Sequence, residues 1–298
     1  MNTALILAFA LQSLTYGAPF LFAALGEVFS ERSGVINIGL EGLMLVGALA
    51  AIMGSAITGD PMIGVVWAML AATVVSALFA LFAIGLKRDQ VIVGTTVNFL
   101  ALGLTGMVYR AWTGGGGRVI PAKTIPALFG NGGTAVNALT LLALLLVPVA
   151  HGLLFRTRFG VTIRATGEVP AAAAAAGARV NVLRTLTTLA TGALCGLGGA
   201  SLSIGIASTF TEGMTSGRGF IALAVVVFGR WTPFGALAAS LLFAAADVAQ
   251  ARLQAAGWFS VPYPLFLMVP YVLTLVALTV RGARVQSPAA LGQSFEQG

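Results

Sequence analysis

The sequence predicts an all-α polytopic membrane protein with about 8–10 transmembrane helices and one short cytoplasmic helix. Of its 298 residues, 58% are hydrophobic and only 8% are charged, whereas soluble domains carry about 25% charged residues. Apolar runs of about 20 residues, the length that crosses a bilayer as a helix, recur along the chain. These runs are continuous rather than alternating, as barrel strands would be, and a helix satisfies its own backbone amides in lipid.

The apolar runs predict nine candidate spans within a single transmembrane domain, 1–298. The run at 219–230 is short, and it can be a half-helix that continues through the turn at Trp231, Thr232 and Pro233. The number of helices is therefore eight to ten. The nine spans are 4–25, 35–57, 62–86, 91–112, 136–155, 183–208, 219–230, 233–251 and 262–280.

The first span, 4–25, is not expected to be a cleavable signal peptide. A signal peptide carries basic residues before its apolar core, and the first charged residue here is Glu27. The stretch GEVFSERSGVINIGLEG, at 26–42, then brings charges and an asparagine up to and into the second span. We expect 26–34 to be a loop and 35–57 to be a helix.

Asn37 and Glu41 are polar residues inside this second span. A charge at the centre of a transmembrane helix costs about 2.5–3.5 kcal/mol, so a buried charge usually faces protein or a water-filled path. Four residues apart in a helix, the two side chains share one face. Two interpretations stay open, a polar solute pathway and hydrogen bonds that hold a neighbouring helix. Glycines here allow close packing or local unwinding; they are Gly34, Gly39, Gly42 and Gly47.

Polar and small residues in the later spans give weaker indications. Asn98 is a further candidate for the pathway, although structural pairing is the preferred interpretation both for it and for Asp247, taken singly. The stretch rich in small residues at 192–200 indicates tight helix packing rather than a site.

Lysine and arginine predict the orientation, because cytoplasmic loops are enriched in both residues. Eleven of these residues flank one side and five the other, which predicts an outside N-terminus and a cytoplasmic C-terminus. The cytoplasmic segments are then 26–34, 87–90, 156–182, 230–232 and the tail 281–298.

Two loops are longer than a simple connection requires. The outer loop, 113–135, is rich in glycine and proline and is expected to be irregular. The cytoplasmic loop, 156–182, contains a proline, six alanines and a glycine, which favour the start, body and end of a short helix. A helix this short needs a partner surface. Alanines anchor poorly in a membrane, so docking to a cytoplasmic protein is preferred to lying on the bilayer.

Several kinds of chemistry are not supported by the sequence. No phosphate-binding loop occurs, because neither Lys87 nor Lys123 follows a glycine, and no hydrolase or zinc-protease motif is present. His151 and Cys195 are the sole residues of their types, which excludes an internal disulfide and a Cys/His metal set. The net charge of +7 could suggest a nucleic-acid partner, but the basic residues lie in short loops, as the positive-inside bias of membrane proteins predicts. We therefore expect a transport protein with no cofactor, no metal and no nucleic-acid partner, rather than an enzyme.

Four stretches together are similar to the permeases of bacterial ABC importers in the nucleoside and simple-sugar group. That group belongs to the larger branched-chain amino acid and ribose permease superfamily. The resemblance extends from about residue 20 to residue 295. The stretches are SERSGVINIGLEGLMLVGA (30–48), RATGEVPAAAAAAGARVNVLR (164–184), GRGFIALAVVVFGRWTPFGALAASLLF (217–243) and PAALGQSF (288–295).

The resemblance implies a multi-pass subunit of the bacterial cell (inner) membrane, which pairs with a second, related but different permease. It also implies a separate cytoplasmic ATP-binding subunit and an extracellular solute-binding protein. Nucleosides are favoured as solutes over simple sugars or branched-chain amino acids. Glu41 and Asn37 would contact the solute or form the gate.

The same resemblance implies that part of 156–182 is the coupling segment, which docks in a groove of the ATPase. Relatives are expected to carry charges where this chain has only alanine. Two other classes stay open, an ion-coupled secondary transporter and a membrane scaffold that transports nothing. The coupling residues are Gly167, Glu168, Pro170, Ala171, Ala172, Ala173, Ala174, Ala175, Ala176 and Gly177.

Overall fold

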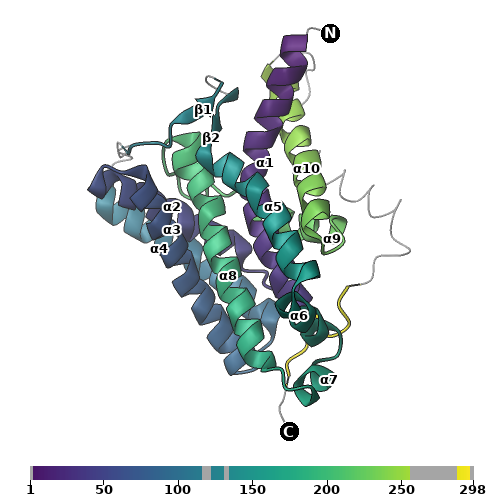
Figure 1. Ribbon diagram of the computed structural model, residues 1–298. Coiled ribbons are helices and arrows are strands. Elements are labelled where there is room, and N and C mark those ends of the chain that lie inside the picture. The colour runs from purple at the N-terminus through teal and green to yellow at the C-terminus, as the bar shows by residue number, and fades with distance from the viewer. Residues whose placement is uncertain (1–2, 116–121, 131–133, 256–286, 296–298) are drawn as a thin grey trace.

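The computed structural model describes residues 3–115, 122–130, 134–255 and 287–295. Long helices run side by side, with the start of α1 at one end of the molecule and the segment 287–295 at the other (Figure 1). Two helices continue into short π-helical stretches, η1 and η3. The elements are α1 (Thr3–Arg32), α2 (Leu40–Thr58), α3 (Pro61–Ala80), η1 (Leu81–Gly85), α4 (Gln90–Thr113), β1 (Ala127–Phe129), β2 (Val136–Asn137), α5 (Ala138–Arg156), α6 (Arg158–Glu168), α7 (Pro170–Ala175), α8 (Val180–Ala200), η3 (Ser201–Ala207), α9 (Arg218–Phe228) and α10 (Pro233–Ala255).

Within the described residues, seven helices are long and apolar enough to cross a membrane, which confirms the predicted fold class. The outer faces of α3 and α4 leave large apolar side chains uncovered, as expected for helices in lipid; Val74 in α3, for example, is 63% exposed. The helix α9 has 11 residues and is too short to span, as the short run at 219–230 indicated. The predicted span 262–280 lies outside the described residues.

Caps in the sequence explain several helix boundaries. Asp60 accepts a hydrogen bond from the backbone of Met62 at the start of α3, where Pro61 occupies the first turn. Asp89 caps α4 in the same way. Gly59 ends α2 in the left-handed conformation that glycine adopts most readily. These short polar connections allow neighbouring helices to pack antiparallel.

The boundary between the first two spans differs from the prediction. The helix α1 does not end near residue 25 but continues to Arg32, and α2 begins at Leu40 rather than residue 35. Glu27 and Glu31 stay within α1 because both carboxylates accept hydrogen bonds from other parts of the protein. The irregular stretch is therefore 33–39, and it is largely buried.

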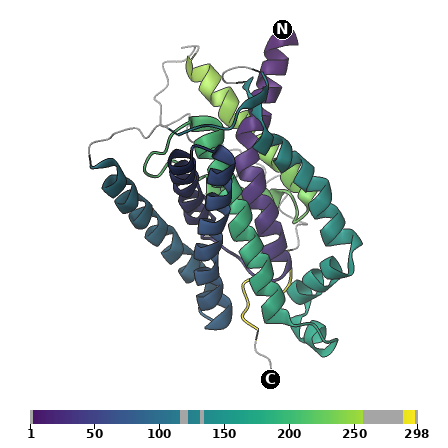
Figure 2. The same ribbon diagram turned by 60° about the vertical axis from the view of Figure 1, so that its left-hand side comes forward.

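The helix α8 packs against α1, α2 and α3, and Figure 2 shows it running alongside α1. Its small residues make these contacts possible, which confirms the predicted tight packing. A Cβ atom on Gly196 would lie 2.4 Å from the carbonyl oxygen of Ala68 in α3. On Gly199 it would lie 2.1 Å from that of Met44 in α2. The backbones of α8 and its neighbours thus touch without intervening side chains.

The outer loop is more ordered than predicted. Its described part contains β1, which pairs antiparallel with β2, just beyond the loop, at the end where α1 begins (Figure 1). The carbonyl oxygen of Lys123 accepts a 2.6 Å hydrogen bond from the Ser55 hydroxyl. The backbone amide of Ile125 donates to the carbonyl of Ile204 in η3. Anchoring to two helices explains why the loop is not irregular throughout.

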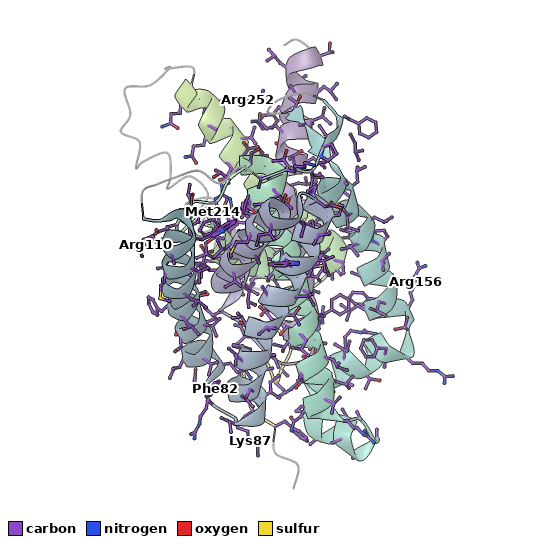
Figure 3. All side chains as sticks on the ribbon, turned by 90° about the vertical axis from the view of Figure 1, so that its left-hand side faces the viewer. Phe82, Lys87, Arg110, Arg156, Met214 and Arg252 are labelled. Atoms are coloured by element: carbon purple, nitrogen blue, oxygen red, sulfur yellow. The ribbon has the colours of Figure 1, made fainter. Side chains whose placement is uncertain are left out.

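The opposite end carries the predicted short helix. It is α7, Pro170–Ala175, and Gly177 follows it with a φ of +90°. The preceding helix α6 was not predicted, although Thr157 caps it through a side-chain hydrogen bond to the amide of Gly160. Figure 3 shows Lys87 toward this end and Arg252 toward the start of α1. Lys87 and α7 thus lie at the end predicted to be cytoplasmic, and Arg252 and the start of α1 lie at the end predicted to be extracellular.

Candidate functional site

The stretch that joins α1 to α2 folds as a buried polar turn. The Ser30 hydroxyl donates to the carbonyl of Val35 at 3.0 Å, and the Ser33 hydroxyl donates to the carbonyl of Ser30 at 2.7 Å. Gly34 has a φ of +96°, and a Cβ there would lie 2.6 Å from Nη2 of Arg184. The run SERSG therefore specifies a turn that only glycine can complete.

Asn37 lies within this turn and is fully buried. Its backbone amide donates to Oε1 of Glu27 at 2.7 Å, and its side-chain oxygen accepts from the amide of Gly39 at 2.9 Å. Because Asn37 precedes α2, it does not share a helical face with Glu41, contrary to the predicted geometry. Within the described part of the chain, Nδ2 of Asn37 and Oε2 of Glu27 have no hydrogen-bond partner.

Glu31 and Arg32 hold the turn between α9 and α10, a contact that the sequence did not indicate. The indole Nε1 of Trp231 donates to Oε2 of Glu31, and both residues are buried. Nε of Arg32 donates to the carbonyl of Trp231 at 3.0 Å. Arg230 and Trp231 both have positive φ values, 54° and 53°, which non-glycine residues rarely adopt. The end of α1 thus stabilises a strained turn about 200 residues away in sequence.

Glu41 lies at the first turn of α2 and reaches the start of α9. Its Oε1 accepts from the amide of Gly217 at 2.8 Å, and its Oε2 accepts from the amide of Gly219 at 2.6 Å. A carboxylate at a helix N-terminus satisfies unpaired amides and interacts favourably with the helix dipole. A Cβ on Gly219 would lie 2.3 Å from the amide nitrogen of Glu41, so the two helices touch here.

Asn98 ties α4 to the same region. Its Nδ2 donates to the carbonyl of Ile38 at 3.0 Å, and its Oδ1 accepts from the amide of Gly42 at 2.8 Å. Both the nitrogen and the oxygen of the Asn98 side-chain amide thus form hydrogen bonds with backbone groups around the start of α2. This pairing agrees with the structural interpretation that the sequence favoured for Asn98.

Glu41 and Asn98 line one open cavity of about 270 Å³, bounded by α2, α4, α9 and the segment before α9. Asn37 is not part of its wall. Met214, which lies in that segment, is labelled beside Arg110 in Figure 3, in the half of the molecule nearer Arg252. The lining residues are Glu41, Gly42, Leu45, Thr95, Asn98, Phe99, Leu102, Gly213, Thr215, Ser216 and Phe220.

The cavity wall is largely apolar, with a few polar oxygens. Phe99 and Phe220 supply aromatic groups, on which a flat apolar ring can pack. The hydroxyls of Thr95 and Ser216 donate to backbone carbonyls, which leaves their oxygens able to accept. The described residues contain no group of histidine, cysteine and acidic side chains that could hold a metal ion. The wall thus offers two aromatic rings and two hydroxyl oxygens to a molecule that enters the cavity.

Comparison with known proteins identifies the group to which the chain belongs. The model of the family described as "Branched-chain amino acid transport system / permease component" matches residues 9–278. The chain belongs to this permease family. It is also 36% identical over 304 residues to the guanosine ABC transporter permease protein NupQ of Bacillus subtilis (strain 168), covering 96% of this chain and 95% of the relative.

Two further relatives extend the comparison. The permease is 31% identical to the nucleoside ABC transporter permease protein NupC of Lactococcus lactis subsp. cremoris (strain MG1363), over 95% of its own length and 94% of the relative's. It is 34% identical to the putative glucose ABC transporter permease protein TsgC13 of Haloferax volcanii, over 93% and 94%. No solved structure matches the permease. These relatives confirm the resemblance predicted from the four sequence stretches.

Proposed function

We propose that this permease is one of two unlike membrane subunits of an ATP-driven nucleoside importer in the bacterial inner membrane. The observation that carries the proposal is its similarity, along almost the whole chain, to a guanosine permease and a nucleoside permease. The permease is also 28% identical to NupP and 25% identical to NupB, second permeases with the same two descriptions in the same strains. Two related but different chains thus recur, which supports a heteromeric pair.

The cavity beside Glu41 is the proposed part of the solute pathway. A nucleoside has a flat base and a sugar with hydroxyls, and the cavity offers Phe99 and Phe220 for the first and polar oxygens for the second. Glu41 acts by holding the start of α9 against the cavity. Asn98 holds α4 against the turn before α2, and the buried Asn37 supports that turn as part of the gate.

The α6–α7 segment is the proposed docking element for a cytoplasmic ATPase. Half of the residues of α7 are exposed, and Val169, between the two helices, is 56% exposed. A small convex surface without long side chains fits a groove on another protein. Gly167 and Glu168 end α6, and the run from Pro170 to Gly177 forms the contact. An extracellular solute-binding protein would deliver its cargo at the opposite end, and the C-terminus would then be cytoplasmic.

A simple sugar is the second candidate solute, because the putative glucose permease is 34% identical over nearly the whole chain. A sugar could use the same hydroxyl-accepting oxygens but would leave the two phenylalanines without a flat partner. The family description keeps branched-chain amino acids as a further alternative. The described cavity wall carries Glu41 but no basic residue, which offers little to an amino acid carboxylate.

The energy source separates this proposal from an ion-coupled transporter. The permease is reconstituted in proteoliposomes with its second permease, ATPase and binding protein. We expect nucleoside uptake that requires ATP, is lost with a hydrolysis-deficient ATPase and is unaffected by a protonophore. Uptake that survives the ATPase mutation but collapses with the protonophore would contradict the proposal.

A further inference from the structure

The segment 287–295 contains the motif PAALGQSF, and the proposed function assigns no role to it. It lies at the base of the helices, beside α6 and α7 (Figure 1). We propose that it is a strap that fixes the end of α6 to the α1–α2 turn and to the start of α8, so that motion of α7 reaches the membrane helices. The coupling role rests on the proposed function, whereas the strap itself rests on the contacts described next.

The strap is bound mainly through backbone groups to three separate segments. The amide of Ala290 donates to the carbonyl of Gly167 at the end of α6, at 2.9 Å. The amide of Gly292 donates to the carbonyl of Gly34 at 3.0 Å. Nη1 of Arg184, in the first turns of α8, donates to the carbonyl of Gln293 at 2.7 Å.

The packing at this junction leaves no room for side chains. A Cβ on Gly167 would lie 2.3 Å from the carbonyl oxygen of Arg32, at the end of α1. A Cβ on Gly34 would lie 3.2 Å from the carbonyl oxygen of Ala290, whose own side chain is buried. Strap, α6 and the α1–α2 turn thus meet backbone to backbone. Such a junction transmits displacement, because close-packed backbones cannot yield by rotating side chains.

Arg184 makes the strap energetically important. Its side chain is 2% exposed, and the acceptors that the described residues offer it are two carbonyls, of Ser33 at 3.1 Å and of Gln293. A buried cation is costly unless its donors are paired. Loss of the strap would leave Arg184 with one partner, and the start of α8 would be free to shift relative to the α1–α2 turn.

Without the strap, α7 would be joined to the bundle chiefly through α6 and α8, its covalent neighbours. A displacement of α7 could then separate Gly167 from Arg32, the packing contact that would remain between the end of α6 and α1. With the strap in place, the end of α6, the turn at 33–34 and the start of α8 form one rigid body, as a rigid-body transition requires. ATP hydrolysis and solute movement thereby remain coupled.

The test compares Ala290→Pro with Ala290→Ser in the assembled complex. Proline lacks the amide that bonds Gly167, whereas serine keeps it at similar size. Amide hydrogen exchange is measured over 158–177 and 33–39, without solute. We expect exchange there to rise at least tenfold in A290P and to stay unchanged in A290S. In transport assays, solute moved per ATP hydrolysed should fall at least fivefold in A290P alone, while hydrolysis continues.

Unchanged exchange and an unchanged transport ratio in A290P would overturn the proposal, as would a parallel fall of uptake and hydrolysis with normal exchange. If A290P does not assemble, truncation after Ser287 provides the same comparison, because it removes the hydrogen bonds of the strap to Gly167, Gly34 and Arg184 without adding a ring. The exchange measurement uses no solute. A complex that transports no nucleoside would therefore contradict the proposed function, but hydrogen exchange measured on that complex would still show whether the strap holds α6 and the α1–α2 turn.

Discussion

Glu41→Ala is expected to reduce uptake by about tenfold while membrane insertion stays normal. The substitution removes both acceptors at the start of α9, at 2.8 and 2.6 Å. Hydrogen bonds to charged groups contribute about 1.5–3 kcal/mol each, and a shift of about 1.4 kcal/mol corresponds to a tenfold change. The segment before α9 forms part of the cavity wall, so loosening it disturbs the proposed pathway. Initial uptake rates, normalised to the amount of permease in the membrane, measure the effect.

Glu212→Ala is the matched control. Glu212 is an acid in the segment before α9, and its side chain is 44% exposed in an ion pair with Arg110. Exposed pairs contribute little, so uptake by this variant should stay close to that of the wild type. Normal uptake by Glu41→Ala would remove Glu41 from the pathway and leave it a dispensable helix cap.

Gly199→Ala is expected to destabilise the folded permease strongly. The added Cβ would lie 2.1 Å from the Met44 carbonyl oxygen and 2.5 Å from the Ala48 amide nitrogen, both backbone atoms of α2. Because no side-chain rotation relieves these contacts, α2 and α8 must separate. Overpacking costs about 1–3 kcal/mol, occasionally more. The midpoint of thermal unfolding in detergent should therefore fall by about 5 °C or more.

Gly103→Ala is the control for this substitution. Gly103 lies within α4, and a Cβ there meets no atom of the described residues within 4 Å. Alanine also has the higher helix propensity, so the midpoint should be unchanged or slightly higher. A Gly199→Ala variant that unfolds at the wild-type temperature would show that α2 and α8 are not packed backbone to backbone.

The spans could be predicted because span length and apolarity are local properties of the chain. Each described span coincides with an apolar run, and α7 lies where a proline, alanines and a glycine indicated a short helix. The glycines of α8 predicted close packing through their size alone. Which helices they meet depends on the arrangement of α2 and α3, and the sequence does not specify that.

The course of the chain from α1 to α2 could not be predicted in the same way. Charges at Glu27 and Glu31 suggested a loop, because a helix in lipid should exclude them. Their partners come from Asn37 and from Trp231, the latter 200 residues away. Long-range hydrogen bonds thus keep α1 helical where composition indicates a break.

The candidate site was partly visible in the sequence. Glu41 and Asn98 are polar residues in apolar runs, and the structure brings them to one cavity. The other wall of that cavity, at 213–220, comes from the segment before α9 and the start of α9, and its local sequence does not indicate which helices it meets. Arg184 and the strap were likewise missed as a unit, because their contacts are made by backbone carbonyls and amides, which every residue has.

The most direct measurement is uptake of a labelled nucleoside by cells with and without this permease, in competition with unlabelled ribose and leucine. We expect deletion to abolish saturable nucleoside uptake, and complementation to restore uptake that only nucleosides compete. Unchanged nucleoside uptake after deletion, together with loss of ribose or leucine uptake, would contradict the assignment of a nucleoside as the solute.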